Sequence, residues 1–441
     1  MQDPSPTKNK LGLWMSTSLV AGNMIGAGVF LLPAALAAYG SISILGWLVA
    51  AAGAFLLAKV FSNLSKLMPK ADGGPYAYAQ KSFGDYAGFL VAWGYWISIW
   101  CTNAAIAVSL VSALSTFFPV LATNAAAAVL TGLGAIWLLT WINTLGIVAS
   151  GRLQLISTVL KIIPLLLVSV GGLFFLRAEN FTPFNASGDA GFSALGATAT
   201  LTFFAFLGLE CATIPSGSVT NPEKTIPRAT MLGTITVTVI YILSSISIMG
   251  MIPAKTLQHS VTPFADAAVI IWGSHAGYWV SAGVAIAAFG ALNGWILIQG
   301  QIPSAIAKDK LFPAAFAREN KKGVPVIGII ISSVLVSVLM IMNFTKGLVE
   351  QFRFLILMST FTVLLPYLLC AAGYIIIRAN QKIKGKWIQA VALGLLAFLF
   401  SLWALAGSGQ ETVYRGFIFL IAGTPLYVWI ILDKNKPSKN K

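Results

Sequence analysis

The sequence predicts an all-α protein that crosses a membrane many times, and three observations support this fold class. The chain is 57% hydrophobic and only 9% charged over 441 residues, whereas soluble domains carry about 25% charged residues. Its mean hydropathy is +0.84. Long apolar runs recur between short polar segments, and each is close to the roughly 20 residues with which a helix crosses the hydrocarbon core.

Twelve spans account for these apolar runs, and together they form a single transmembrane domain over residues 1–441. A longer polar stretch between the seventh and eighth spans, PAKTLQHSVTPFADAA, predicts a short surface helix. The expected spans cover residues 12–37, 41–66, 83–113, 124–146, 153–176, 192–214, 229–252, 274–305, 325–344, 352–377, 388–406 and 413–432.

The positive charges of the chain predict its orientation in the membrane. Of the 28 lysines and arginines, two fall inside spans (Lys59 and Lys161), five fall in segments on one side, and the remaining 21 fall on the other side. Because cytoplasmic loops are enriched in lysine and arginine, this distribution predicts that both termini are cytoplasmic. The net charge of +15 therefore reflects topology and does not predict nucleic-acid binding. The five residues expected outside are Arg177, Lys255, Lys346, Arg353 and Arg415.

Few residues offer the chemistry of an enzyme or of a metal site. The cysteines Cys101, Cys211 and Cys370 lie in apolar spans, where we expect small core residues rather than disulfides or metal ligands. His259 and His275 lack the spacing of metal ligands. The polar start MQDPSPTKNK leads directly into the first span, so we expect no cleavable signal peptide. These features favour a transporter without a cofactor over an enzyme or a receptor.

The first span contains an unusual concentration of glycine. Its GNMIGAGVF stretch places Gly22, Gly26 and Gly28 in one apolar segment, although a glycine inside a helix costs about 1 kcal/mol relative to alanine. One interpretation is a helix that unwinds near the middle of the membrane and presents backbone N–H and C=O groups to a cavity. The alternative is close helix packing, because Gly22 and Gly26 have the spacing of small residues at helix contacts.

The sixth span carries the clearest charge inside the membrane, Glu210 in FFAFLGLECATIPSG. A carboxylate at that depth is unfavourable unless it is paired or lines a cavity. Gly208 precedes it and Pro215 and Gly217 follow it, so this helix is also expected to be interrupted. Interrupted helices at matching positions are typical of transporters built from two inverted repeats. We therefore predict a 5+5 repeat over residues 12–176 and 192–377, with two appended spans at 388–432.

Several stretches of the chain resemble one large group of transporters. GNMIGAGVFLLPAALA, GGPYAYAQKSFG and FAFLGLECATIPSGSVTNPEKTIPRAT are similar to the amino acid–polyamine–organocation superfamily, and GWILIQGQ and LLPYLL fit it too. Within it the chain resembles the basic amino acid/polyamine antiporters, including the bacterial arginine/agmatine, lysine/cadaverine and putrescine/ornithine exchangers. The resemblance implies a LeuT-type fold and a homodimer in the bacterial inner membrane. It also implies exchange of a basic amino acid for its decarboxylated amine by alternating access, which supports acid resistance.

The same resemblance implies a set of functional residues. The substrate's carboxylate and amino groups would meet the unwound backbone of spans 1 and 6, and its cationic end would lie against aromatic and polar groups. Tyr95, Glu210 and Tyr367 match an outer gate. Tyr76 matches a cytoplasmic tyrosine linked to the pH response. The implied substrate-binding residues are Met24, Ala27, Gly28, Ser98, Ile99, Asn103, Phe204, Leu207, Trp295 and Ser359.

An aromatic face suits the cationic end of such a substrate independently of any resemblance. It attracts a guanidinium or ammonium group by roughly 0.5–2 kcal/mol without a fixed counter-charge, so the carrier can release its cargo. For Trp295 the alternative is packing, and for Asn103 it is an interhelical hydrogen bond. Glu210 is either a gating or pH-sensing group, or a structural carboxyl that is always hydrogen-bonded.

The chain departs from the arginine exchangers in three ways. Phe204 replaces a gating tryptophan, with Ala205 in place of its serine neighbour, and Ala27 replaces a serine in the first break. The third is Lys161 in STVLKIIPLLL, where many sodium-independent amino acid transporters of the superfamily also carry a lysine. Because burial disfavours the charged form of a lysine, Lys161 is a candidate for proton coupling unless its side chain snorkels to the surface. The alternative function is therefore a proton-coupled, sodium-independent amino acid importer.

Overall fold

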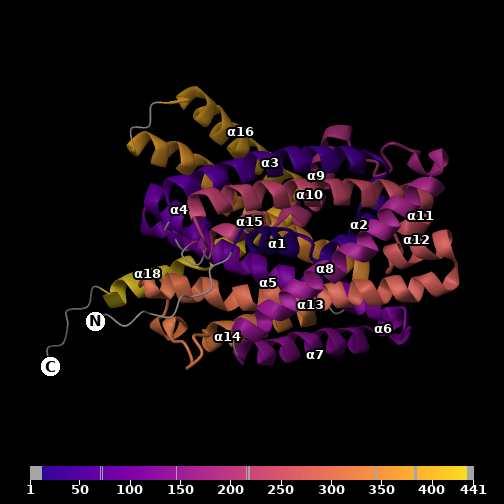
Figure 1. Ribbon diagram of the computed structural model, residues 1–441, viewed down its shortest axis with the longest axis horizontal. Coiled ribbons are helices and arrows are strands. Elements are labelled where there is room, and N and C mark those ends of the chain that lie inside the picture. The colour runs from indigo at the N-terminus through magenta and orange to yellow at the C-terminus, as the bar shows by residue number, and fades with distance from the viewer. Residues whose placement is uncertain are drawn as a thin grey trace.

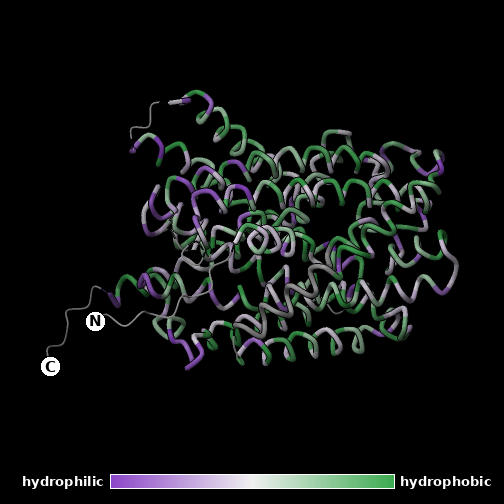
Figure 2. Tube along the Cα trace, in the orientation of Figure 1, coloured by the Kyte–Doolittle hydropathy of each residue, from purple (hydrophilic) through white to green (hydrophobic). Residues whose placement is uncertain are grey.

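Apolar helices run side by side along the long axis of the molecule in the computed structural model (Figure 1). The structure describes residues 12–69, 71, 73–145, 147–214, 216, 219–342, 345–381 and 385–434, and within them it leaves the side chains of residues 27–28 and 147–159 undescribed. Hydrophobic residues dominate the length of the helices, and hydrophilic residues gather at the two ends of the bundle (Figure 2). This distribution is that of a bundle with a membrane-embedded middle.

Eighteen α-helices and several short 3-10 helices make up the described chain. The α-helices are α1 (Leu13–Met24), α2 (Leu32–Ala37), α3 (Ile42–Leu67), α4 (Pro75–Phe83), α5 (Asp85–Ser115), α6 (Val120–Thr123), α7 (Ala125–Thr144), α8 (Ile147–Gly172), α9 (Gly191–Phe203), α10 (Pro222–Met251), α11 (Ala254–Leu257), α12 (Pro263–Trp272), α13 (Ser274–Lys308), α14 (Val326–Met342), α15 (Leu348–Asn380), α16 (Trp387–Gly407), α17 (Gln410–Ile421) and α18 (Thr424–Lys434). The 3-10 helices are η1 (Ala27–Phe30), η2 (Leu173–Phe175), η3 (Ala178–Phe181), η4 (Phe204–Phe206), η5 (Cys211–Thr213) and η7 (Ala314–Ala317).

Eight helices in the described part of the chain are long and apolar enough to cross a membrane. They are α3, α5, α7, α10, α13, α15, α16 and the continuous segment of α17 and α18. Shorter apolar helices cover Leu160–Phe175, Gly191–Phe206, Pro263–Trp272 and Val326–Met342. The prediction of an all-helical protein with many membrane-crossing helices is therefore confirmed, and the count of twelve spans and the 5+5 repeat stay predictions.

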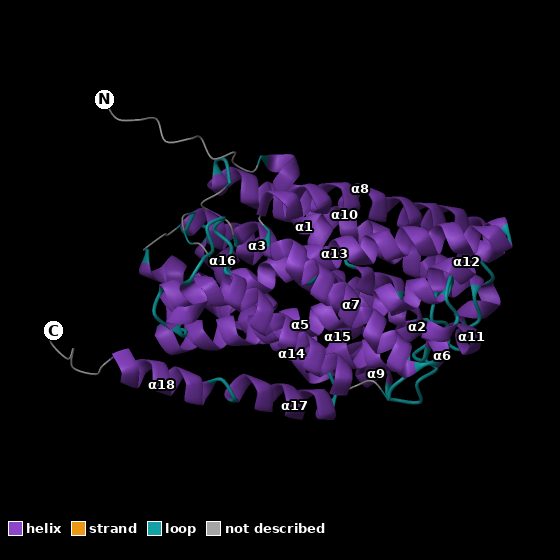
Figure 3. Cartoon of the chain, turned by 90° about the horizontal axis from the view of Figure 1, so that it is seen from below, coloured by secondary structure: helices purple, strands orange, loops and turns teal. Residues whose placement is uncertain are grey.

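Helix α5 is the centre of the bundle. It is buried over most of its length, and it packs against both α13 and α15. Helix α3 packs against α9 and α10, and α1 packs against α10. Helices α4 and α18 lie at one end of the bundle, and α6, α11 and α12 lie at the other end (Figure 1). Seen from below, α17 and α18 run along an outer edge (Figure 3).

Two sequence predictions differ from the structure in their local detail. The loop predicted to hold one surface helix holds two, α11 and α12. The predicted last span at 413–432 is divided by a turn between α17 and α18. A Cβ at Gly423 in that turn would lie only 2.7 Å from the Trp93 ring, and Pro425 then occupies the first turn of a new helix, a position that proline favours.

Candidate functional site

The first interrupted helix ends among its glycines. Helix α1 stops at Met24, Ile25 leaves helical geometry with a ψ of 64°, and the chain continues as η1 and α2. Two side chains bind the backbone carbonyls there: the Lys161 ammonium donates to the Gly22 carbonyl at 2.5 Å, and the Tyr241 hydroxyl donates to the Met24 carbonyl at 2.6 Å. The negative end of the helix dipole also favours a cation at this place. The break is thus held in a defined geometry.

The second interruption follows α9. The turn η4 is followed by extended Leu207 and then by Gly208, whose φ of +105° is strained for any residue with a side chain. A Cβ at Gly208 would lie 3.1 Å from the Cβ of Asn23 in α1. Glycine therefore serves two purposes at this position, because it permits the backbone turn and lets the two interrupted helices touch. The predicted interruptions at the first and sixth spans are both present.

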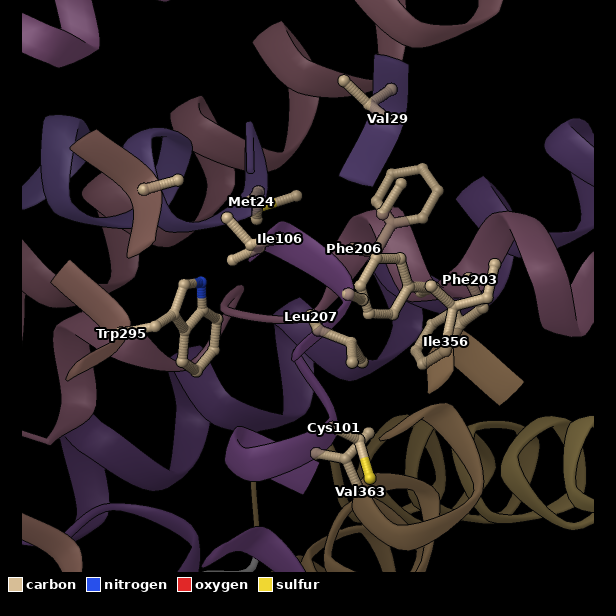
Figure 4. Close-up of a cluster of buried hydrophobic side chains, with 14 of the residues drawn as sticks. Met24, Val29, Cys101, Ile106, Phe203, Phe206, Leu207, Trp295, Ile356 and Val363 are labelled. Carbon is tan, nitrogen blue, oxygen red and sulfur yellow. The ribbon is translucent and has the colours of Figure 1, made fainter. Parts of the chain in front are cut away.

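A small cavity lies between the two interruptions. Its free space holds roughly one water molecule. Figure 4 shows Met24, Leu207 and Trp295 gathered at this place. No charged residue lines the cavity within the described part of the chain. The lining residues are Asn23, Met24, Gly26, Val29, Thr102, Ile106, Phe204, Ala205, Leu207 and Trp295. A substrate of amino acid size would enter only after these side chains or helices move.

Amide groups near the cavity keep polar atoms free. Neither polar atom of the buried Asn23 amide has a nitrogen or oxygen partner among the described residues. The Asn103 amide donates to the Gln299 side-chain oxygen at 2.7 Å, but its own oxygen is buried and lacks a described partner. A buried polar atom without a partner is unfavourable by about 1–3 kcal/mol. These atoms are therefore suited to a polar ligand.

The hydroxyl groups of the same region are mostly paired with each other. The Ser359 and Thr102 hydroxyls lie 2.7 Å apart, and Ser359 also lies 3.0 Å from the Ser98 carbonyl. The Ser98 hydroxyl donates to the Tyr95 carbonyl at 2.7 Å. Ligand binding through Ser359 or Thr102 would therefore replace a hydrogen bond between α5 and α15.

Glu210 is the centre of a buried cluster beside this region. Its two carboxylate oxygens each accept a hydroxyl, one from Tyr95 of α5 and one from Tyr367 of α15. All three side chains are buried, and two hydroxyl donors satisfy an ionised carboxylate. The cluster thereby joins α5, α15 and the segment after the second interruption.

The cluster is displaced from the cavity toward one end of the bundle. Tyr95 precedes Ser98 in α5, a helix that starts beside α4, and Tyr367 follows Ser359 in α15 toward the part of that helix that contacts α4. The cluster therefore lies toward the α4 end. The distribution of positive charges predicts that this end is cytoplasmic, whereas the resemblance implies an outer gate. The two predictions disagree about this cluster, and the side on which the gate lies stays a prediction.

Helix α4 closes the same end of the bundle. The Tyr76 hydroxyl donates to the Asp309 carboxylate at the end of α13 at 2.9 Å. Gly74, at φ +52°, lets the loop before α4 approach the second interrupted helix, because a Cβ there would lie 2.5 Å from the Thr213 hydroxyl. Burial and the hydrogen bond to Asp309 raise the pKa of Tyr76 far above its ordinary value of 10.0. The phenol therefore keeps its proton at physiological pH, and a pH response at this contact would have to come from another group.

Removing the Tyr76 hydroxyl should loosen this closure. Tyr76→Phe loses one hydrogen bond, so we expect the labelling rate of Cys370 to rise about two- to tenfold in a variant that keeps Cys370 as its single cysteine. Cys370 is a suitable reporter because it is buried and its thiol lies 3.4 Å from the Pro75 carbonyl at the start of α4. Because Tyr76 stays protonated, the increase should be the same from pH 5 to pH 8.

The matched control for this experiment is Tyr86→Phe. Its hydroxyl also makes one hydrogen bond, 2.9 Å long, but to Thr424 on an exposed surface. An unchanged labelling rate in Tyr76→Phe, or an equal increase in both variants, would contradict the role given to Tyr76.

The predicted substrate-binding residues divide into three groups in the structure. Met24, Phe204, Leu207 and Trp295 line the cavity. Ser98, Ile99, Asn103 and Ser359 are buried in the adjoining parts of α5 and α15. The side chains of Ala27 and Gly28 lie outside the described residues, and so do Pro215, Gly217 and the polar start MQDPSPTKNK. The proton-coupling candidate Lys161 lies at the first interruption, where its ammonium donates to the Gly22 carbonyl.

Three polar residues of the site were not predicted from the sequence. Asn23 lines the cavity, but in GNMIGAGVF the glycines give the stronger sequence signal. Thr102 lies directly before Asn103, and its own contribution to the lining gave no separate signal. Gln299 lies in the quoted stretch GWILIQGQ, one helical turn after Trp295. A helical projection of α13 would have placed it on the same face.

Residues 11–430 match the family model described as amino acid permease. The chain is also similar over nearly its whole length to curated proteins. It is 32% identical to the putrescine transporter PotE of Haemophilus influenzae, over 97% of this chain and 98% of the relative. It is 33% identical to a cadaverine/lysine antiporter of Escherichia coli, over 96% and 94%. It is 33% identical to a candidate arginine/ornithine antiporter of Bacillus subtilis, over 98% of each chain.

Proposed function

The chain belongs to the amino acid permease family of the amino acid–polyamine–organocation superfamily, and from that premise we propose that it exchanges a basic amino acid for its decarboxylated amine. Its relatives named above transport putrescine or exchange cadaverine for lysine, and none of these names describes an enzyme. The candidate pairs are arginine with agmatine, lysine with cadaverine, and ornithine with putrescine. The proposal includes alternating access, an inverted repeat and a homodimer in a bacterial inner membrane with cytoplasmic termini.

The observation that carries the proposal is an uncharged cavity with an aromatic residue and an amide side chain in its lining. Trp295 and the Asn23 amide both line it, and its described lining includes no carboxylate that would trap a cation. An aromatic face attracts ammonium and guanidinium groups without a fixed counter-charge. Such a site accepts a singly charged amino acid and a doubly charged amine in turn, and it releases both.

The binding step tests this proposal through Trp295. Trp295→Leu removes the aromatic face, so we expect the dissociation constants of both members of the transported pair to rise about 2- to 30-fold. Isothermal titration of the purified protein with each amino acid and amine measures the effect. The control is Trp279→Leu on the same helix, because Trp279 is 79% exposed and faces away from the cavity. Unchanged affinity in Trp295→Leu would contradict an aromatic cation site.

A second candidate function rests on Lys161. The ammonium of this fully buried residue contacts the unwound first helix, in which a change of charge would alter the geometry of the break. This placement favours a proton-coupled importer in which Lys161 gains and loses a proton. The two candidates make opposite predictions for substitutions of Lys161.

A further inference from the structure

We propose that Gln299 is a positioning residue that fixes the Asn103 amide so that Asn103 offers the substrate a hydrogen-bond acceptor and not a donor. The inference rests on the proposed function and deepens it, because it identifies what selects the cationic end of the substrate. It concerns a chain of three side chains and one backbone carbonyl, which joins α14, α13 and α5.

The backbone carbonyl of Ile329 in α14 sets the direction of the chain. A carbonyl oxygen only accepts hydrogen bonds, so the Gln299 atom that lies 3.2 Å from it is the amide nitrogen. The same nitrogen donates to the Ser333 hydroxyl at 2.8 Å. The other polar atom of the Gln299 amide is therefore its oxygen, and this atom accepts from the Asn103 nitrogen at 2.7 Å. The Asn103 nitrogen is used in this hydrogen bond, so the polar atom of the Asn103 amide that stays without a partner is its oxygen.

The backbone of Gln299 is held as firmly as its side chain. Its carbonyl accepts the Trp96 indole N–H at 3.2 Å and the Ser332 hydroxyl at 3.1 Å. Gln299, Asn103 and Ser333 are all fully buried, so water does not compete for these hydrogen bonds. A rotation of the Gln299 amide by half a turn would place its oxygen against the Ile329 carbonyl. The orientation of the Gln299 amide is therefore fixed by the Ile329 carbonyl, which can only accept a hydrogen bond.

Asn103 adjoins residues that line the cavity, and its own side chain is not part of that lining. Asn103 directly follows Thr102 in α5, and Gln299 lies one turn after Trp295 in α13, and both Thr102 and Trp295 line the cavity. The Asn103 oxygen is buried and has no partner in the described part of the chain. Buried acceptors are nearly always paired in folded proteins, so this atom is suited to a donor brought by the substrate.

Fixed polarity gives chemical selection. A guanidinium or a primary ammonium group only donates hydrogen bonds, and an acceptor satisfies it. An amide free to rotate would also offer its NH₂ group, which such a cation cannot use. The amino acid and its decarboxylated amine share the cationic end, so Gln299 should affect both to the same degree. A group that bound the carboxylate would affect the amino acid alone.

Gln299→Leu tests the inference by exchange kinetics in proteoliposomes, with the pair that the wild-type protein exchanges. Loss of the Gln299 amide frees Asn103, so we expect KM to rise about tenfold for both the amino acid and the amine, with kcat within about twofold of wild type. The matched control is Gln351→Leu. Gln351 is also buried, but its side chain donates a hydrogen bond, 3.4 Å long, to the Met340 carbonyl away from the cavity. This control should leave KM unchanged.

A double-mutant cycle with Asn103→Ala separates positioning from a general effect on packing. If Gln299 acts through Asn103, the KM of the double variant should equal that of Asn103→Ala alone. Additive effects, a fall in kcat without a rise in KM, or a rise in KM for the amino acid only would each overturn the inference. If the Gln299→Leu variant does not fold, Gln299→Met is tested in its place. The methionine side chain is unbranched and cannot hold the Asn103 amide.

The experiment also distinguishes this inference from the function on which it rests. A wild-type protein that exchanges no basic amino acid or amine contradicts the proposed function. A wild-type protein that exchanges such a pair, with the same KM in Gln299→Leu, contradicts only the role of Gln299.

Discussion

Glu210→Ala should reduce exchange by about a hundredfold or more, because it leaves two buried tyrosine hydroxyls without their shared acceptor. Tyr95 and Tyr367 both donate to this carboxylate, and the three residues join α5, α15 and the segment after the second interruption. Closure of the bundle at the α4 end would then lose the contact that connects α5, α15 and this segment. Glu210→Gln keeps the volume and one acceptor oxygen, so we expect a smaller loss, of about tenfold.

Initial rates of exchange in proteoliposomes, normalised to folded protein, measure these losses. The control is Glu411→Gln, which removes an exposed carboxylate that pairs with Arg415 at 2.6 Å. Exposed ion pairs contribute little, so this variant should exchange at the wild-type rate. Wild-type exchange in Glu210→Ala would show that the cluster is not part of the gate.

Lys161→Met should slow exchange by about tenfold, because the Gly22 carbonyl loses its buried donor. If the role of Lys161 is to hold the first interruption, the ratio of the rates at pH 5 and pH 7 should stay as in wild type. Lys161→Gln should then recover most of the rate, since its amide also donates a hydrogen bond but does not titrate.

The importer predicts the opposite result for the same variants. If Lys161 carries the transported proton, Lys161→Met and Lys161→Gln should both lose all dependence on a proton gradient. The control is Lys59→Met in α3, because the Lys59 side chain is exposed. Loss of gradient-driven uptake in both Lys161 variants, with uptake kept in Lys59→Met, would select the importer over the exchanger.

The positions of the two interruptions could be predicted because they break a strong local rule. Glycines and a carboxylate inside apolar spans are unfavourable, so their presence marks where the helices stop. The turn between α17 and α18 gave a weaker signal, because Gly423 and Pro425 lie in an otherwise continuous apolar run. The residues that meet around Glu210 depend on how α5 and α15 run antiparallel past each other. The order of residues in the sequence does not show this relation.

For the polar residues of the site, too, the sequence predicts less than the structure shows. Trp295 and Asn103 were predicted through the resemblance of their stretches to the superfamily, and Trp295 lies in the cavity lining. The role of Gln299 depends on a backbone carbonyl 30 residues away, in a different helix. Hydrogen-bond polarity of this kind is a property of tertiary packing. The sequence therefore predicts which groups meet the substrate better than it predicts what orients them.

The most direct test of exchange uses purified protein in liposomes loaded with one unlabelled compound: arginine, lysine, ornithine, agmatine, cadaverine, putrescine or none. Uptake of labelled basic amino acids is followed at pH 5 and pH 7. The proposed function predicts uptake only into vesicles that contain the matching amino acid or amine, which also identifies the pair. Equal uptake into empty vesicles, driven by an inward proton gradient, would contradict exchange. It would favour the proton-coupled importer in which Lys161 gains and loses the proton.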